Sequence, residues 1–376
     1  MIDLLIQNVT LIDLNDGENR SADVAVQGGR IERITTANSG LTARKTLNGN
    51  GNFLFPGLID FHTHLFRHGS SFGMDADRLL TAGVTFAVDM GTSGYVNYPA
   101  MYTCDISGKR IGLRSFINLS PVGQAGRGIN EPLHDDVINV DAMQQIMNRY
   151  PGQIVGVKVR ISRNIVGDIG LKPLYRAVEA GEKLGLPVCV HTTDPPVSAT
   201  EICRVLRPGD IYSHVLQGKG NTILDENDEV QQGVLDAKER GVLMELGNGK
   251  MNFNFHVAKR AAACGFWPDI ISSDATQATF HKAELMWDLP TVMSKFLGLG
   301  MPLHQVLRAV TETPATRLGL GDRIGNIIPG YDADLTICRL EQKDVTFWDS
   351  DGHSCQGNMR LVPETTIKSG QIVCPQ

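Results

Sequence analysis

The middle of this chain alternates short apolar runs with amphipathic stretches, and this alternation limits the possible folds more than any other feature. The amphipathic stretches have helical periodicity, as in KPLYRAVEAGEKLG at residues 172–185. Strands that alternate with helices favour a parallel sheet. Eight runs match the strand count of an α/β protein with a (β/α)8 TIM barrel over residues 53–322. The runs are FLFPGLIDFH, VTFAVDMG, GLRSFINLS, IVGVKVRIS, PVCVHT, DIYSHV, VLMELGNG and DIISSDA.

The two ends of the chain carry a different pattern. Residues 1–52 contain short stretches rich in β-branched residues, separated by turn dipeptides such as Asp16-Gly17. Residues 323–376 repeat this pattern in ADLTICRL, KDVTFWDS and ETTIKSGQIV. We therefore predict that residues 1–52 and 323–376 pair into one small β-sandwich domain beside the barrel.

Composition and charge exclude several classes of protein. The chain has 376 residues and a formal net charge of −6, with acids and bases mixed, which is not typical of nucleic-acid or polybasic membrane binding. The first residues include Asp3 and Asp13 and lack the positive region of a signal peptide. No run of about 18 apolar residues predicts a membrane span. The seven scattered cysteines, without a CxxC motif, are typical of reduced thiols, so we expect a cytoplasmic protein.

Residues able to bind metal occur at five of the eight apolar runs. Active sites of such barrels lie at the C-terminal ends of the strands. Imidazoles and carboxylates are common ligands of zinc and similar divalent ions. A single histidine at the end of a run is more often a core residue, but chance is a poor explanation for the whole ordered set. In chain order, the residues are His62 and His64, Lys158, His191, His214 and Asp274.

The spacing of these residues predicts how they would group. His62 and His64 are two residues apart, so on an extended strand their side chains point to the same side and can reach one ion. His191 and His214 come from neighbouring strands and can hold a second ion. Asp274, from the last strand, would lie beside the first strand when the barrel closes. It could ligate a metal and take a proton from bound water.

Three motifs give the chain a family resemblance. FPGLIDFHTH at residues 55–64 resembles the first-strand signature of the amidohydrolase superfamily. GNIIPGYDADL at residues 325–335 resembles its signature at the return to the β module, and Thr313-Pro314-Ala315 matches its last barrel helix. The resemblance extends over essentially the whole chain.

The resemblance implies roles for the ligand set. His62 and His64 would bind the more buried metal, and His191 and His214 the second. Lys158 would carry carbon dioxide as a carbamate that bridges two divalent ions, because an ammonium cannot ligate a cation. Asp274 would bind the first metal and act as general base and then general acid. A metal-bridging hydroxide would be the nucleophile, because metal binding lowers the pKa of water toward about 7.

The branch within the superfamily depends on other positions. Dihydroorotases usually place an arginine two residues after the His-x-His pair, whereas Arg67 stands one place later here. The stretch Glu245-Leu246-Gly247-Asn248-Gly249 resembles instead a group of deacetylases acting on N-acetyl amino acids or O-acetyl hydroxy acids, and Lys158-Val159-Arg160 and Ser272-Ser273-Asp274 do so too. The resemblance therefore favours a metal-dependent hydrolase of an acetyl amide or ester of a small carboxylic acid.

Four residues are predicted substrate contacts. Arg160 lies two residues beyond Lys158, so it should point to the same side and could bind the substrate carboxylate, although a surface salt bridge is an equal interpretation. Tyr95 follows a glycine-containing loop and could line the pocket. Asn248 could donate a hydrogen bond from the seventh strand end. His281 could face the pocket or cap a helix.

Two alternatives remain open from the sequence. The first is a cyclic-amide hydrolase of the dihydroorotase or hydantoinase kind. The second is a non-catalytic barrel that acts as a scaffold, although a scaffold has no need to keep six ligands. The ligand types suit zinc, with manganese, iron or cobalt as further possibilities. The resemblance also implies a homo-oligomer. We expect its partner to be a small-molecule substrate that carries a carboxylate, and we expect neither nucleic acid nor membrane as a partner.

Overall fold

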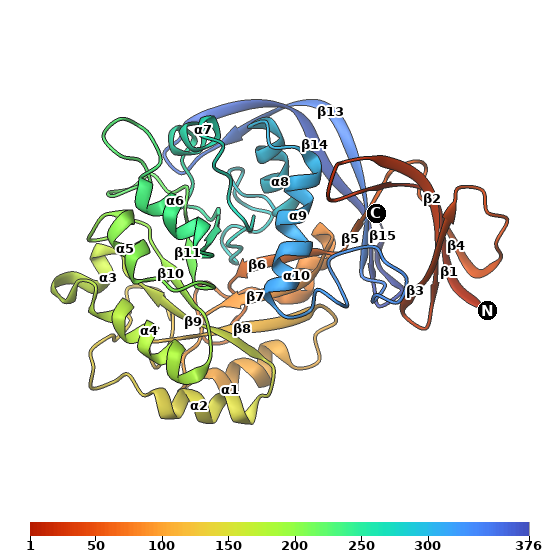
Figure 1. Cartoon of the computed structure of the whole chain (residues 1–376). Helices are drawn as coiled ribbons and strands as arrows, with labels where there is room; N and C mark the ends of the chain where they lie inside the picture. The colour runs from red at the N-terminus through yellow and green to blue at the C-terminus, as the bar shows by residue number, and fades with distance from the viewer. Residues whose placement is uncertain (376) are drawn as a thin grey trace.

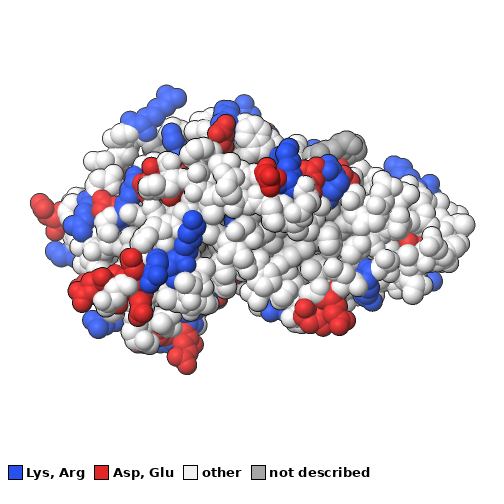
Figure 2. Space-filling model, turned by 90° about the horizontal axis from the view of Figure 1, so that it is seen from above, with Lys and Arg blue, Asp and Glu red and all other residues white. Residues whose placement is uncertain are grey.

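The computed structural model describes residues 1–375 and has two lobes (Figure 1). In Figure 1 the left lobe holds a parallel sheet with helices outside it, and the right lobe holds a mixed sheet built from both ends of the chain. Figure 2 shows that acidic and basic side chains are interspersed over the upper face of this elongated molecule. Among the described residues, no helix combines the length and apolar character needed to cross a membrane.

The parallel sheet has seven strands, each hydrogen-bonded to the next one along the chain. They are β6 (Leu58–Thr63), β7 (Val84–Met90), β8 (Gly112–Asn118), β9 (Ile154–Arg160), β10 (Val188–His191), β11 (Ile211–Ser213) and β12 (Leu243–Glu245). The eighth predicted run forms no strand of its own. Parallel bridges nevertheless join Ile270 to Glu245 and Ala275 to Thr63. The sheet therefore curls until its first and last strands reach the same segment.

The two faces of the curled sheet pack differently. Inside the curl, Phe61 of β6 meets Phe116 of β8 edge-on, with ring centroids 6.1 Å apart. On the outside, Val157 and Val159 of β9 belong to the large apolar cluster that includes the helices. Successive side chains of a strand point to opposite faces, so Lys158, between these valines, points inward. This alternation places the polar side chain of Lys158 on the inner face of the curled sheet.

Helices cover the outer face of the parallel sheet (Figure 1). They are α1 (Tyr98–Met101), α2 (Val140–Arg149), α3 (Arg163–Val166), α4 (Lys172–Leu184), α5 (Ala199–Val205), α6 (Gln232–Glu239), α7 (Phe255–Ala263), α8 (Leu289–Gly298), α9 (Leu303–Val310) and α10 (Glu312–Arg317), with the 3₁₀ helices η1 (Ala76–Ala82) and η3 (Gly167–Ile169) and the π-helical turn η2 (Tyr102–Ile106). Ser198 and Glu201 form a capping box at the start of α5, and α4 ends at Gly185 with a φ of 66°. Local sequence thus sets the start of α5 and the end of α4.

Both ends of the chain join in the mixed sheet. Its strands are β1 (Ile2–Ile12), β2 (Asn19–Gln27), β3 (Arg30–Thr36), β4 (Ala43–Asn48), β5 (Phe53–Pro56), β13 (Leu335–Trp348), β14 (Ser354–Lys368) and β15 (Gln371–Pro375). The strand order is β15-β14-β13-β5-β1-β2-β3, with β4 also paired to β1. Because β5 pairs with both β1 and β13, the ends meet edge to edge in one sheet. The predicted pairing of the two ends is present, but the structure does not confirm a two-sheet sandwich.

The long hairpin of β13 and β14 arches from the mixed sheet over the parallel-sheet lobe (Figure 1). At its tip, Ser350 N–H donates to Phe253 O at 2.9 Å, and the Asp349 carboxylate accepts from Phe255 N–H at 3.0 Å. Lys295 Nζ of α8 donates to Trp348 O at 3.2 Å. The hairpin therefore anchors the loop that follows β12, and this loop borders the cavity described next.

Candidate metal centre

Residues at the C-terminal ends of the parallel strands line one cavity of about 480 Å³. The side chains come from β6, β9 and β10 and from the segments that follow β11, β12 and Ile271. All six residues that the sequence predicted as metal ligands line this cavity, together with Arg160. The six are His62, His64, Lys158, His191, His214 and Asp274.

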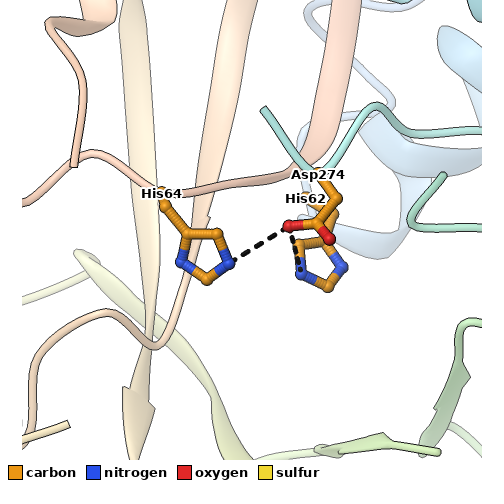
Figure 3. A group of neighbouring side chains, drawn as sticks. All are labelled: His62, His64 and Asp274. Carbon is orange, nitrogen blue, oxygen red and sulfur yellow. Dashed lines mark ion pairs between the residues drawn. The ribbon is translucent and has the colours of Figure 1, made fainter. Parts of the chain in front are cut away.

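Three of these side chains converge on one point (Figure 3). Asp274 Oδ1 lies 3.6 Å from His62 Nε2 and 3.2 Å from His64 Nε2. One ligand atom from each residue lies within 4.8 Å of the others, so the group could hold a metal ion. Both histidines are buried, whereas the Asp274 side chain keeps 12% exposure toward the cavity.

The second nitrogen of each of three histidines is already occupied. His62 Nδ1 lies 3.2 Å from the Glu245 carboxylate, and His214 Nδ1 lies 2.9 Å from Gly247 O. Carboxylate and carbonyl oxygens only accept, so both Nδ1 atoms carry the proton. His64 Nδ1 meets Thr92 Oγ1 at 2.8 Å, and the Thr92 hydroxyl proton is donated to Asp89. Each Nε2 is therefore left with a free lone pair, which is the form that ligates a metal.

His191 and His214 form a second group beside the first. Their ring centroids are 4.4 Å apart, and His214 lies 5.0 Å from the ring of His62. His214 and Asp274 have φ values of 65° and 53°, a left-handed backbone conformation that residues other than glycine rarely adopt. Such backbone strain is concentrated at functional sites, and here it turns both side chains toward the cavity.

The electrostatics favour metal binding over protonation. Burial lowers the pKa of His214 to about 3 and that of His191 well below its usual value. Burial alone would raise the pKa of Asp274, but the adjacent His62 and His64 hold it far below its ordinary value. Neutral His191 and His214 and an ionised Asp274 are in the protonation states that bind metal. The donor set therefore fits a divalent ion.

Lys158 stands on β9 with its side chain buried in the same cavity wall. Its Nζ donates to Cys189 Sγ at 3.4 Å. Gly91 lies against its stem, and a Cβ at Gly91 would come within 2.5 Å of Lys158 Cβ. The lysine is thus held in one position among prospective ligands, where an ammonium has no ligating electron pair.

Arg160 lines the cavity as predicted, but it is not a free cation. Its Nη1 donates to Glu131 Oε1 at 2.7 Å and to Gln124 Oε1 at 3.3 Å. Its Nε is buried and has no hydrogen-bond partner among the described residues. Within the described chain, Arg160 therefore keeps one donor unpaired, while Glu131 and Gln124 hold its Nη1.

The other three predicted substrate contacts lie outside the cavity lining within the described part of the chain. Tyr95 donates its hydroxyl to Val137 O at 3.0 Å. Asn248 accepts from Lys295 Nζ at 2.9 Å and turns its amide toward backbone carbonyls. His281 stacks between Phe280 and Trp287. Each of these three side chains contacts other residues of the chain instead of the cavity, so the structure does not support them as substrate contacts.

Several residues that shape the site were not predicted from the sequence to be functional. Glu245 and Asp89 orient the histidines, and Asp60 accepts two hydrogen bonds from Ser273, next to Asp274. Asn252 Nδ2 donates to Asp274 Oδ2 at 2.8 Å. The available signal was a carboxylate near the end of an apolar run, as in VLMELGNG, FLFPGLIDFH and VTFAVDMG.

Comparisons with known proteins identify the family of the chain. The Amidohydrolase family model matches residues 267–374. A deacetylase of Agrobacterium fabrum is 30% identical over 93% of this chain and 86% of its own length. A deacetylase of Enterococcus faecalis is 29% identical over 98% of each chain.

Solved structures give the same result. One described as an adenine deaminase superposes with a TM-score of 0.91 at 28% identity, covering 99% of this chain and all of the other. One described as a dihydroorotase has a TM-score of 0.89 at 28% identity and covers 99% of each chain. The chain therefore belongs to the amidohydrolase superfamily and is a hydrolase that acts on carbon–nitrogen bonds.

Proposed function

We propose that this protein is a metal-dependent deacetylase that removes an acetyl group from the nitrogen or oxygen of a small carboxylic acid. The observation that carries the proposal is the convergence of His62 Nε2, His64 Nε2 and Asp274 Oδ1 in the cavity. The choice of acyl group is supported by the relatives from Agrobacterium fabrum, Brucella anthropi and Enterococcus faecalis, all of which are named deacetylases.

The proposed cofactor is a pair of divalent ions, with zinc as the first choice and manganese, iron or cobalt as alternatives. His62, His64 and Asp274 would hold one ion, and His191 and His214 the other. Lys158 would serve both after reacting with carbon dioxide, because a carbamate supplies the oxygen ligands that an ammonium lacks. Bound ions lower the pKa of water toward about 7 and polarise a carbonyl group.

The protein's own residues would move the proton. Asp274 presents Oδ1 to the centre of the site, while Asn252 holds its other oxygen at 2.8 Å. In the proposed reaction, the oxygen of water attacks the acetyl carbonyl carbon and Asp274 takes the proton of the water. The carbon–nitrogen or carbon–oxygen bond then breaks, and Asp274 returns the proton to the leaving atom. The products are acetate and the free amino or hydroxy acid.

Arg160 is the proposed anchor of the substrate carboxylate. Replacing it with Gln should raise KM for the acetylated acid by about 10–100-fold, as expected for one hydrogen bond to a charged group, with a smaller change in kcat. The methyl ester of the same substrate should show little difference between the two enzymes. Steady-state kinetics with both substrates would measure this.

Arg163 offers a matched control for the Arg160 variant. It lies just beyond the same strand, is 53% exposed and pairs with Asp194 at 3.4 Å. Arg163→Gln should leave KM near the wild-type value. An unchanged KM for the acid in Arg160→Gln would remove Arg160 from substrate binding and leave it as the partner of Glu131.

A cyclic-amide hydrolase is the second candidate, because a solved structure described as a dihydroorotase superposes with a TM-score of 0.89. Against it, Arg67 is 58% exposed and lies 3.8 Å from Asp75, outside the lining of the cavity. An arginine in that place is not available to a substrate at the metal centre.

One experiment separates the candidates. The purified protein should contain divalent metal by elemental analysis, and incubation with a panel of N-acetyl amino acids and O-acetyl hydroxy acids should release acetate. Ring opening of dihydroorotate or a hydantoin without acetate release would favour the second candidate instead. A protein that neither contains nor takes up divalent metal would contradict both and favour a scaffold.

The finer architecture follows as part of the proposal. We propose that residues 53–322 form a closed (β/α)8 barrel, except that β5 at their start pairs into the mixed sheet, and that residues 1–52 and 323–376 form, with β5, a separate β-sandwich-like domain. The bridges from residues 270–275 to both β12 and β6 support closure of the barrel. Apolar residues of β1, β2 and β3 pack with those of β5, β13 and β14, which supports a common core for the second domain.

The cellular context is also a proposal. The seven cysteines are free, which fits a reducing compartment such as the cytoplasm. The mixed charges of the face in Figure 2 fit a small-molecule enzyme rather than a nucleic-acid-binding or membrane-binding protein. We also propose a homo-oligomer, which sedimentation of the purified chain would test.

A further inference from the structure

Glu245 is a buried carboxylate at the centre of the site that has no place in the proposed ligand set. It ends β12, and no part of it is exposed. An ionised carboxylate in such a position costs several kcal/mol of desolvation unless hydrogen bonds compensate it. Both of its oxygens accept hydrogen bonds from hydroxyl groups, Oε2 from Ser213 and Oε1 from Ser272. The group therefore acts as an acceptor on both sides.

The first contact of Glu245 is with His62. Glu245 Oε2 lies 3.2 Å from His62 Nδ1, and Ser213 Oγ donates to the same oxygen at 2.5 Å. Because the carboxylate can only accept, it holds the imidazole proton on Nδ1. The Nε2 lone pair of His62 is then directed at the point shared with Asp274.

The second connection runs through Ser272 to His214. The Ser272 hydroxyl donates to Glu245 Oε1 and accepts from Gly247 N–H at 3.0 Å. Gly247 O in turn accepts from His214 Nδ1 at 2.9 Å. Gly247 has a φ of 48°, and a Cβ there would come within 2.5 Å of His214 Nδ1, so only glycine fits this link.

We propose that Glu245 is a positioning residue of the metal centre: it fixes the tautomer of His62 directly and the orientation of His214 through Ser272 and Gly247. The inference rests on the proposed function, because it treats both histidines as ligands. A carboxylate behind a ligating imidazole also increases the basicity of the ring. The loss of such a partner typically weakens metal binding by about 10–100-fold.

The test is Glu245→Gln, measured as metal affinity of the metal-free protein rather than as activity alone. Glutamine keeps the volume but removes the charge, and its NH2 group cannot accept from a hydroxyl. The affinity for zinc, measured by competition with a chelator, should fall by about 10–100-fold. The absorption spectrum of the cobalt-substituted protein should also change, because the geometry around His62 is altered.

The mixed sheet offers a matched control. Asp23 is also a buried carboxylate, and it accepts three hydrogen bonds, one from Asn8 N–H and two from Ser39. Asp23→Asn should lower thermal stability without altering zinc affinity or the cobalt spectrum. This control separates loss of a buried charge from loss of a partner at the metal centre.

The possible results are distinct. Wild-type zinc affinity and an unchanged cobalt spectrum in Glu245→Gln would overturn the inference while leaving the proposed function intact. A wild-type protein without metal affinity would instead contradict the proposed function itself. If Glu245→Gln does not fold, Ser272→Ala takes over the test: zinc affinity should fall several-fold, and an unchanged affinity would overturn the inference.

Discussion

Replacing Lys158 with Ala is expected to reduce bound metal and to lower turnover by about 10³-fold or more, since the ions contribute several kcal/mol to the transition state. Lys158 is buried in the wall that holds all four histidines. As an ammonium it would repel the ions, so in the proposed centre Lys158 would bind metal only as the carbamate. Elemental analysis and acetate release would measure both effects.

Rescue and isotope labelling make the Lys158 prediction sharper. Short carboxylates such as formate or propionate should restore part of the metal content and rate of Lys158→Ala, because they can occupy the place of the carbamate. The wild-type protein with metal and ¹³C-labelled bicarbonate should show a carbamate carbon signal that the variant lacks.

Lys295 is a suitable control for the Lys158 variant. It is equally buried, but its Nζ donates to three oxygens, those of Asn248, Leu285 and Trp348. Lys295→Met should lower thermal stability and show no response to added carboxylates. Full metal content and rate in Lys158→Ala would remove the carbamate from the proposed centre.

The sequence predicted the parallel sheet well because each strand there corresponds to a short apolar run in the local sequence. Seven of the eight apolar runs are strands, and helices lie between them as the periodicity indicated. The region of Ile270 to Ala275 makes only single bridges, and its backbone turns at Asp274 with a φ of 53°. The arrangement of the terminal segments was less predictable, since pairing through β5 is a contact between residues far apart in the chain.

The clustering of the candidate ligands in one cavity was predictable for a simple geometric reason. The carboxyl ends of parallel strands meet at one edge of a curled sheet, so the runs that end in His62, His191 and His214 deliver these side chains to one cavity. The residues behind the ligands were not predictable in the same way. Glu245 meets His62 across the curl of the sheet, and the register that brings them together is not visible in either segment alone.

Loop residues were the least predictable part of the site. Tyr95, Asn248 and His281 lie in segments without regular structure, where sequence spacing does not determine the direction of a side chain. Asn252 donates to Asp274, and this part of the chain is held by hydrogen bonds from Phe253, next to Asn252, and from Phe255, at the start of α7, to the tip of the distant β13–β14 hairpin. A contact of that kind follows only from the complete fold.

Replacing Asp274 with Asn is expected to keep most of the metal but to lower kcat by about 10²–10⁴-fold, because the same group serves as base and acid. The amide has nearly the same shape, and its oxygen can still face His62 and His64. Its NH2 group would then meet Asn252 Nδ2, which now donates to Asp274 Oδ2 at 2.8 Å. Rotation of the Asn252 amide and of the Thr193 hydroxyl, which donates to Asn252 Oδ1, can relieve this conflict.

The Asp274 prediction has a control in the same cavity wall. Asp194 also lines the cavity but pairs with Arg163 at 3.4 Å and is 42% exposed, so Asp194→Asn should cost much less in kcat. Metal content, kcat and KM measured for both variants distinguish a proton-transfer role from a ligand role. If Asp274→Asn loses its metal and its rate together, Asp274 acts mainly as a ligand. If it keeps the metal and turns over at the wild-type rate, another group must move the proton, and the proposed mechanism is wrong at that step.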